Sequence, residues 1–164
     1  MEEYIVSVYV DNHFGTLARV AGMFRRRGFN IDTLTVGETE DPAFSRITIS
    51  FRGDEKFKKQ LVAQLEKIED VKNVKVLERE SSVTRELVLI KIRNDPATRP
   101  EVMNICEIFR ARVVDYSAET LTIEITGKDK LSAFIDLMRR YGIIEICRTG
   151  IVALERGSAN IKEQ

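Results

Sequence analysis

This 164-residue chain has no excess of charge of either sign and no long apolar run. Its 26 Lys and Arg residues balance 26 Asp and Glu residues, so it presents no net positive field to attract nucleic acid or an anionic membrane. No apolar stretch approaches the ~20 residues that a membrane-spanning helix needs. Residues Met1, Glu2 and Glu3 lack the basic start of a signal peptide. We therefore expect a cytoplasmic protein with no nucleic-acid partner and no membrane partner.

Side chains for metal binding and nucleophilic catalysis are scarce. The chain has two cysteines, Cys106 and Cys147, which are far apart and outside any CxxC motif, and one histidine, His13. Such a set provides no disulfide framework, no zinc cluster and no recognisable catalytic triad. We interpret both cysteines as packing residues and His13 as an exposed loop residue. The prediction is a chain without catalytic residues and without a metal site.

The residues that are present form a pattern of strands and helices that occurs twice. Residues 4–10 are β-branched and aromatic, which is typical of a strand. Apolar residues then recur at helical spacing from Leu17 to Phe24, and Gly28 is predicted to end this helix. The other elements predicted in this half are strands at 31–36 and 44–51, a helix at 54–68 and a strand at 71–77.

The second half repeats this order after a polar stretch that has almost nothing to bury and is predicted to be a linker. Its predicted elements are a strand at 87–92, a helix that starts with the capping-box sequence Thr98 to Glu101, strands at 113–116 and 121–125, a helix around 131–138 and a last strand at 143–154. This order predicts an α+β chain with two tandem ferredoxin-like βαββαβ domains. The helices cover one face of each sheet, so the other face must be solvated or meet a partner. The predicted boundaries are 1–78 for the first domain, 79–85 for the linker, 86–157 for the second domain and 158–164 for a frayed polar tail.

The turn at residues 11–15, before the first helix, is the strongest candidate for a binding site. A glycine at a helix mouth lets a ligand approach the backbone closely, and unpaired amides there suit a carboxylate. The amides in question are those of Gly15, Thr16 and Leu17. The side chains of Asn12 and Asn30, which is predicted to open the neighbouring strand, can bond either end of an amino acid. Local chemistry alone favours a plainer alternative, an ordinary turn in which Asn12 and Thr16 cap the helix.

Two other functions of the same fold are less well supported. An acylphosphatase-like hydrolase needs an arginine in its first turn to hold phosphate, and residues 11–15 contain none. An RNA-binding module stacks bases on several aromatic rings of its open sheet face. In the strand at 44–51, Phe44 is the one ring that joins the polar face, which cannot stack a series of bases.

Short segments along the whole chain resemble a known family. They are Asn12 to Val20, Phe24 to Ile31, Leu34 to Val36, Asp41 and Pro42, Ser45 to Thr48, Glu86 to Ile92, Glu107 to Arg110 and Arg148 to Val152. In this order, from near residue 4 to about residue 157, they are similar to the regulatory small subunits of acetolactate synthase, whose N-terminal domain is an ACT domain.

The resemblance implies a non-catalytic protein that forms a homodimer through its N-terminal ACT domains and binds the catalytic large subunit of acetolactate synthase. In that family the small subunit activates the enzyme of branched-chain amino acid biosynthesis. A branched-chain amino acid, chiefly valine, binds at the dimer interface and reverses the activation. Thiamine diphosphate, Mg and FAD are then expected only in the catalytic partner, and this chain holds no cofactor.

The resemblance also implies which residues bind the effector. Asn12, Gly15 and Asn30 match positions of the family's effector site, and the neighbours carried over with them are Phe14, Thr16, Leu17 and Ile31. The second half has residues 94–98 before its helix, with no glycine there, so we expect no second equivalent pocket. The alternative function is a different ACT-type amino-acid sensor, for example one that controls transcription through another partner.

Overall fold

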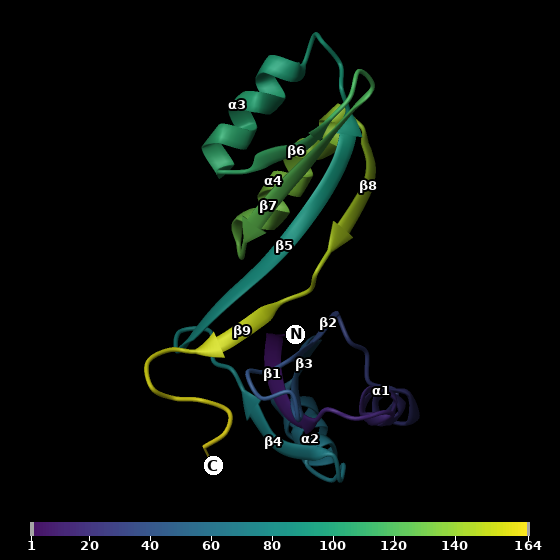
Figure 1. Cartoon of the computed structure of the whole chain (residues 1–164), viewed down its shortest axis with the longest axis vertical. Coiled ribbons are helices and arrows are strands. Elements are labelled where there is room, and N and C mark those ends of the chain that lie inside the picture. Colours follow the sequence, from purple (N-terminus) through teal and green to yellow (C-terminus); the bar gives the residue numbers. More distant parts are fainter. Residues whose placement is uncertain (1, 164) are drawn as a thin grey trace. The chain divides into compact units, whose positions relative to one another are not determined.

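Strand β1 lies in the middle of the first sheet, and its residues from Ile5 to Val10 are all buried. The computed structural model describes residues 2–163 and has the elements of this unit in the predicted order (Figure 1). They are β1 (Glu2–Asp11), α1 (Thr16–Arg27), β2 (Thr33–Glu38), β3 (Phe44–Gly53), α2 (Glu55–Leu65) and β4 (Val71–Val76). All neighbouring strands are antiparallel, in the order β2-β3-β1-β4, so β2 and β4 are the edges of this sheet.

One face of the sheet and the two helices enclose the core of this N-terminal unit. Its buried residues include Val6, Val8, Val10, Val20, Phe24, Ile47, Ile49, Phe51, Leu61 and Leu65. Full burial of side chains of this size contributes roughly 1.5–3 kcal/mol each. Gly28 ends α1 in the left-handed conformation, with a φ of 66°, as the sequence predicts. The core is thus made by the period-2 face of β1 and β3 and by the helical stripe of α1 and α2.

The C-terminal unit repeats this architecture with its own core. Its elements are β5 (Ser82–Arg93), α3 (Arg99–Phe109), β6 (Arg112–Tyr116), β7 (Thr120–Gly127), α4 (Lys130–Met138), a 3-10 turn (Arg139–Tyr141) and β8 (Ile143–Arg148). The strand order β6-β7-β5-β8 is that of the first unit. Val88, Ile90 and Ile92 of β5 are in the core, whereas Leu87 and Leu89 on the other face are half-buried. Two ferredoxin-like βαββαβ units are therefore confirmed.

The two units share even an irregularity in strand pairing. A β-bulge interrupts the pairing of β1 with β4 between Tyr9 and Val10, and another interrupts the pairing of β5 with β8 between Lys91 and Ile92. Each bulge lies close to the end of the central strand, where the chain turns toward the next helix. The repeat seen in the sequence is therefore a structural repeat at the level of strand register.

The predicted linker and last strand need correction. Strand β5 begins at Ser82, because Ser82, Thr84 and Glu86 alternate as buried residues although they are polar. The strand predicted at 143–154 is broken: β8 ends at Arg148, and β9 (Val152–Glu155) follows Gly150, which has a φ of 83°. Strand β9 pairs with β5, and the chain from Ile151 onward packs with the N-terminal unit rather than with Arg85–Gly150.

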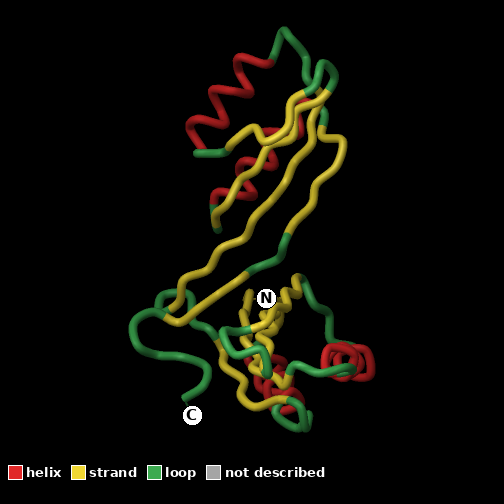
Figure 2. Tube along the Cα trace, viewed as in Figure 1, coloured by secondary structure: helices red, strands yellow, loops and turns green. Residues whose placement is uncertain are grey.

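The polar tail is held in place up to Glu163, which corrects the expectation that it is frayed. The segment after β9 has no helix or strand (Figure 2). Ile161 is nevertheless buried at 4% exposure, and Asn73 of β4 donates a hydrogen bond of 2.6 Å to its carbonyl oxygen. Gln164 lies outside the described residues. The open face of the N-terminal sheet thus meets a segment of its own chain.

A second small apolar cluster anchors this returning segment. It consists of Ile5, Leu77 and Ala153, with Ile151 packed against it. Within residues 2–163, no helix has the length and apolar character that crossing a membrane requires.

Candidate functional site

The turn at residues 11–15 joins the end of β1 to the start of α1. Gly15 is the N-cap residue of α1 and has a φ of 90°, a left-handed conformation that other L-residues adopt only with strain. A Cβ atom built on Gly15 would meet nothing within 4 Å. The conformation therefore requires glycine, and the space beside the helix mouth is open to a ligand.

Asn12 does not cap the helix. Its side-chain nitrogen donates hydrogen bonds to Glu38 Oε1 at 3.1 Å and to the Pro42 carbonyl at 2.9 Å, and its backbone amide donates to the Ala43 carbonyl at 2.8 Å. Helix α1 has no side-chain cap hydrogen bond at all. The plain-cap interpretation of Asn12 is therefore wrong. Asn12 ties the turn to the end of β2, which uses its two N–H donors and leaves its Oδ1 as an acceptor.

Thr16 and His13 contact each other within the turn. The Thr16 amide donates to the His13 carbonyl at 3.3 Å, and the Thr16 hydroxyl lies 3.3 Å from His13 Nδ1. Thr16 is buried, while the side chains of Phe14 and Leu17 are exposed. Of the amides predicted to receive a carboxylate, that of Thr16 is already engaged. Those of Gly15 and Leu17 belong to the first turn, where amides lack an intrahelical partner.

Asn30 and Ile31 lie in the loop between α1 and β2, so Asn30 does not open the strand as predicted, because β2 starts at Thr33. Asn30 is exposed and Ile31 is half-buried. Asn12 precedes α1 and Asn30 follows it, and the 12 residues of this helix span about 18 Å. One chain therefore does not bring Asn12 and Asn30 together.

Edge strand β2 carries exposed apolar residues beside the turn. Leu34 and Val36 are opposite Ile49 and Ile47 in the strand register, so they are on the helix-covered side of the sheet. They are nevertheless 38% and 42% exposed, because the core under the helices is centred on β1 and β3. We call Leu34 and Val36 the β2 apolar surface, which can receive a branched side chain or a second protein.

Asp70 is a site residue that sequence reasoning missed. It is buried, its carboxylate lies 3.1 Å from His13 Nε2 and 2.8 Å from Arg19 Nη1, and its carbonyl accepts a hydrogen bond from the Asp11 amide. The available signal was topological. In an antiparallel pair the start of β4 lies beside the end of β1, so a residue just before Val71 must lie near the turn.

Asp11, His13 and Asp70 have potential metal-binding atoms within 4.8 Å of one another. Both carboxylates already have cationic partners, however, since Lys72 lies 2.7 Å from Asp11 and Arg19 pairs with Asp70. The hydrogen bond with Asp11 raises the pKa of Lys72. The arrangement acts chemically as an ion-pair network that holds the turn against β4.

The corresponding turn of the C-terminal unit is built differently. Asn94 is buried, its side-chain nitrogen donates to the Ser117 carbonyl at 2.6 Å, and its Oδ1 accepts from Arg99 Nε at 2.6 Å. Thr98 is the N-cap of α3 but makes no side-chain cap bond, so the predicted capping box is wrong. The Asn94 acceptor is occupied where that of Asn12 is left for a ligand, and no glycine opens the mouth of α3.

Comparison with known proteins agrees with both units. Residues 6–73 match the family model of the AHAS small subunit-like ACT domain, and residues 85–157 match that of the small subunit of acetolactate synthase. The chain is 52% identical over 158 residues to the probable acetolactate synthase small subunit of Archaeoglobus fulgidus, covering 95% of this chain and 98% of that one. It is 43% identical over 155 residues to the acetolactate synthase isozyme 3 small subunit of Salmonella typhimurium, covering 93% and 95%.

A solved structure has the same fold over the whole chain. The crystal structure of the acetolactate synthase small subunit from Thermotoga maritima superposes with a TM-score of 0.88 at 42% identity, covering 97% of this chain and all of that one. The two family models match one unit each, in chain order. This chain therefore belongs to the family of acetolactate synthase small subunits, with an ACT domain of the regulatory type at its N-terminus.

Proposed function

We propose that this protein is the valine-sensing regulatory subunit of an acetolactate synthase. It dimerises through its ACT domains, binds and activates the catalytic large subunit, and loses that effect when valine binds. The family implies a catalytic large-subunit partner, and the proposal assigns the thiamine diphosphate, Mg and FAD of the reaction to that partner. The present chain then performs no chemistry and acts by changing the equilibrium between states of the complex.

The main support for a site shared between two chains is the separation of Asn12 from Asn30 within one chain. Asn12 is tied to Glu38 at the end of β2, whereas Asn30 lies just before Thr33 at its start. If two β2 edges pair antiparallel about a two-fold axis, the start of one strand lies beside the end of the other. Asn30 of the partner subunit then approaches Asn12, and each dimer has two sites that both chains complete.

The edge of the N-terminal sheet is suited to this pairing. Strand β2 is an edge with six residues, and an unpaired edge offers backbone donors and acceptors to another strand. Leu34 and Val36, the β2 apolar surface, lie along this edge. Pairing with a second copy would bury these residues and satisfy the open backbone groups of the strand.

The chemistry of the turn is suited to an amino acid. The valine α-carboxylate is placed at the mouth of α1, where the helix dipole and the Gly15 and Leu17 amides favour an anion. The ammonium is placed on oxygen acceptors, the first of which is Asn12 Oδ1, left over after both N–H donors bond Glu38 and Pro42. The apolar side chain meets the β2 apolar surface.

Valine regulates by binding one arrangement of the complex better than another. Differential affinity of this kind gives couplings of about 1–3 kcal/mol, or roughly 5- to 150-fold in the affinity of the second partner. By reciprocity, the large subunit must change the valine affinity of the small subunit by the same factor. Titration calorimetry with and without the large subunit measures this factor directly.

Mixed dimers test the shared site. One differently tagged chain carries Asn12→Ala and the other Asn30→Ala, and the dimer with both tags is purified. If each site takes Asn12 from one chain and Asn30 from the other, the mixed dimer has one site with both substitutions and one intact site. Calorimetry should then find half the normal number of valine molecules bound with normal affinity. Both homodimers should lose normal-affinity binding. If the mixed dimer has no normal-affinity site, the shared-site proposal is wrong.

The regulatory part of the proposal is tested with the large subunit of the source organism. Adding this protein should raise the rate of acetolactate formation, and valine should return the rate toward that of the large subunit alone. Co-purification of the two subunits without any effect on rate would contradict activation. An effect on rate that valine does not change would contradict sensing.

A further inference from the structure

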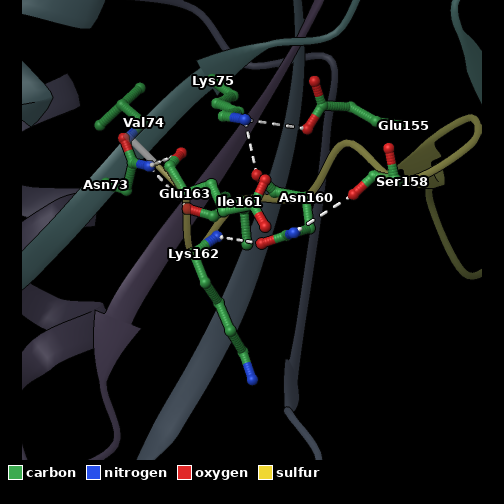
Figure 3. Close-up of polar contacts among 9 residues, drawn as sticks. All are labelled: Asn73, Val74, Lys75, Glu155, Ser158, Asn160, Ile161, Lys162 and Glu163. Carbon is green, nitrogen blue, oxygen red and sulfur yellow. Dashed lines mark hydrogen bonds and ion pairs between the residues drawn. The ribbon is translucent and has the colours of Figure 1, made fainter.

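The C-terminal strap, defined as residues 157–163, lies against the open face of the N-terminal sheet. Lys75 of β4 contacts the Asn160 carbonyl at 2.6 Å and Glu155 at 3.2 Å, and Asn73 donates to the Ile161 carbonyl at 2.6 Å (Figure 3). A polar chain end without secondary structure is otherwise expected to fray. Here β4 side chains bind the strap through its backbone carbonyls, so the strap follows the sheet at a defined position.

A half-open cavity of about 620 Å³ lies between the strap and the sheet. Tyr9 of β1 and Arg46 of β3 contribute to it from the sheet, Thr39 and Glu40 from the β2–β3 turn, and Ala159 and Lys162 from the strap. Its volume lies in the range typical of small-molecule sites. Tyr9 is stacked on Phe44, with ring centroids 4.8 Å apart, which gives the cavity a rigid aromatic side.

Arg46 contributes a half-buried guanidinium to this cavity, which is also lined by the carboxylates of Glu40, Glu155 and Glu163. Its Nε is buried and has no hydrogen-bond partner among residues 2–163. Desolvation lowers the pKa of Arg46, and the charge of Glu155 opposes that effect. Glu155 is itself paired with Lys75, and Glu40 is paired with Lys162. A desolvated charge is costly unless it is paired, so an anion would complete this group.

The backbone beside Arg46 leaves room for that anion. Gly37 of β2 is directly opposite Arg46 in the strand register. It has no side chain, and a Cβ atom built there would meet nothing within 4 Å. The guanidinium therefore has open space on its β2 side. Arginine is the residue best suited to hold a carboxylate or a phosphate, because its planar fork of N–H donors matches both.

We propose that the cavity under the C-terminal strap is a second small-molecule site, which takes the carboxylate or phosphate group of a metabolite on Arg46. The site is separate from the valine site, since Arg46 and the strap are not part of the turn at residues 11–15. The strap forms one wall, so ligand binding and strap closure are coupled. Binding of the metabolite stabilises the closed strap, and loss of the strap weakens binding.

Titration calorimetry on the full chain tests the site, with inorganic phosphate and malonate as probes of the two anion types. Sodium chloride at matched ionic strength is the control for screening. We expect at least one probe to bind, and the one that binds more tightly identifies the anion class. Arg46→Gln should weaken that binding at least tenfold. Arg52→Gln, an exposed arginine of the same strand whose ion pair with Asp32 is 3.6 Å long, should leave it unchanged.

Truncation after Gly157 supplies an independent test, with circular dichroism to verify that both units remain folded. The truncated chain should bind the probe at least tenfold more weakly. In the full chain, the probe should slow hydrogen exchange of residues 158–163, and Asn104→Ala, at an exposed position of α3, should not alter this protection. Absence of binding by both probes, or equal binding by the Arg46→Gln and wild-type chains, would overturn the proposal. Neither result would affect the valine site.

Discussion

Asp70 and Arg19 join the start of β4 to helix α1 through an ion pair of 2.8 Å, and the Asp70 side chain is only 4% exposed. The other carboxylate oxygen of Asp70 lies 3.1 Å from His13 Nε2. A single buried carboxylate thus contacts both the turn proposed to bind valine and the helix whose mouth faces the ligand. The geometry of the effector site should therefore depend on a residue that does not touch the ligand.

The substitution Asp70→Asn removes the negative charge of this side chain and leaves its size nearly unchanged. We expect the free energy of unfolding of the N-terminal unit to fall by about 1–3 kcal/mol, because the bonds to Arg19 and His13 are lost or weakened. Hydrogen exchange of the α1 amides in urea measures the change. Asp136→Asn is the matched control, since Asp136 is 73% exposed and pairs with Arg139 on the surface. Equal effects of the two substitutions would contradict the role assigned to Asp70.

Asn12→Ala should weaken valine binding by roughly ten- to a hundredfold. The substitution removes a hydrogen bond to a charged ligand group, which is worth about 1.5–3 kcal/mol. It also releases Glu38 and Pro42 from the turn, and both effects act in the same direction. Titration calorimetry gives the affinity. Asn104→Ala, at an exposed position of α3, is the control, and an unchanged affinity of the Asn12 variant would count heavily against the site.

Gly15→Ala and Gly15→Asp separate strain from charge. Both add a Cβ at a φ of 90°, which costs about 1–2 kcal/mol in stability. The aspartate also places a negative charge beside the ligand carboxylate, so it should abolish valine sensitivity, whereas the alanine should reduce it less. The inhibition of the assembled enzyme by valine is the measurement. A fully valine-sensitive Gly15→Asp variant would exclude the proposed orientation of the ligand.

The two cysteines should differ in reactivity toward a thiol reagent such as 5,5′-dithiobis(2-nitrobenzoate). Cys106 is buried, and its burial raises the pKa of the thiol, whereas Cys147 is exposed. Because the thiolate is the reactive form, the native protein should show one fast-reacting thiol. Cys147→Ser should remove the fast phase and Cys106→Ser should keep it. Rapid reaction of both thiols before unfolding would show that the core around α3 opens readily.

Much of the fold could be predicted because it is encoded locally. The β-branched and aromatic residues at 4–10 predict a strand, and the helical spacing from Leu17 to Phe24 reflects contact with a core on one side of the helix. Gly28, at the end of α1, likewise indicates a left-handed backbone conformation at that position. The prediction for Cys147 was wrong, since it is exposed rather than packed. It lies on an edge strand, where one face of the sheet has no cover.

The candidate site could be predicted only in part. Gly15 and Asn12 were recognisable because glycine and asparagine have special roles at turns. Their bonding partners were not, since Glu38 and Pro42 are 26 and 30 residues from Asn12 in the chain. Asp70 was missed for the same reason, because its contact with Arg19 spans 51 residues. Such pairs depend on how strands align, which no local pattern specifies.

The sequence by itself determined the repeated βαββαβ order, the special turn before α1 and the family, because each depends on residue types in a given order along the chain. Tertiary structure alone decided where the chain goes after Arg148. The strap returns to β4 through contacts such as that of Lys75 with Asn160, 85 residues away. It also decided that Asn12 and Asn30 are far apart in one chain. Both outcomes arise from the packing of segments that are distant in sequence, and their energies are absent from any local pattern.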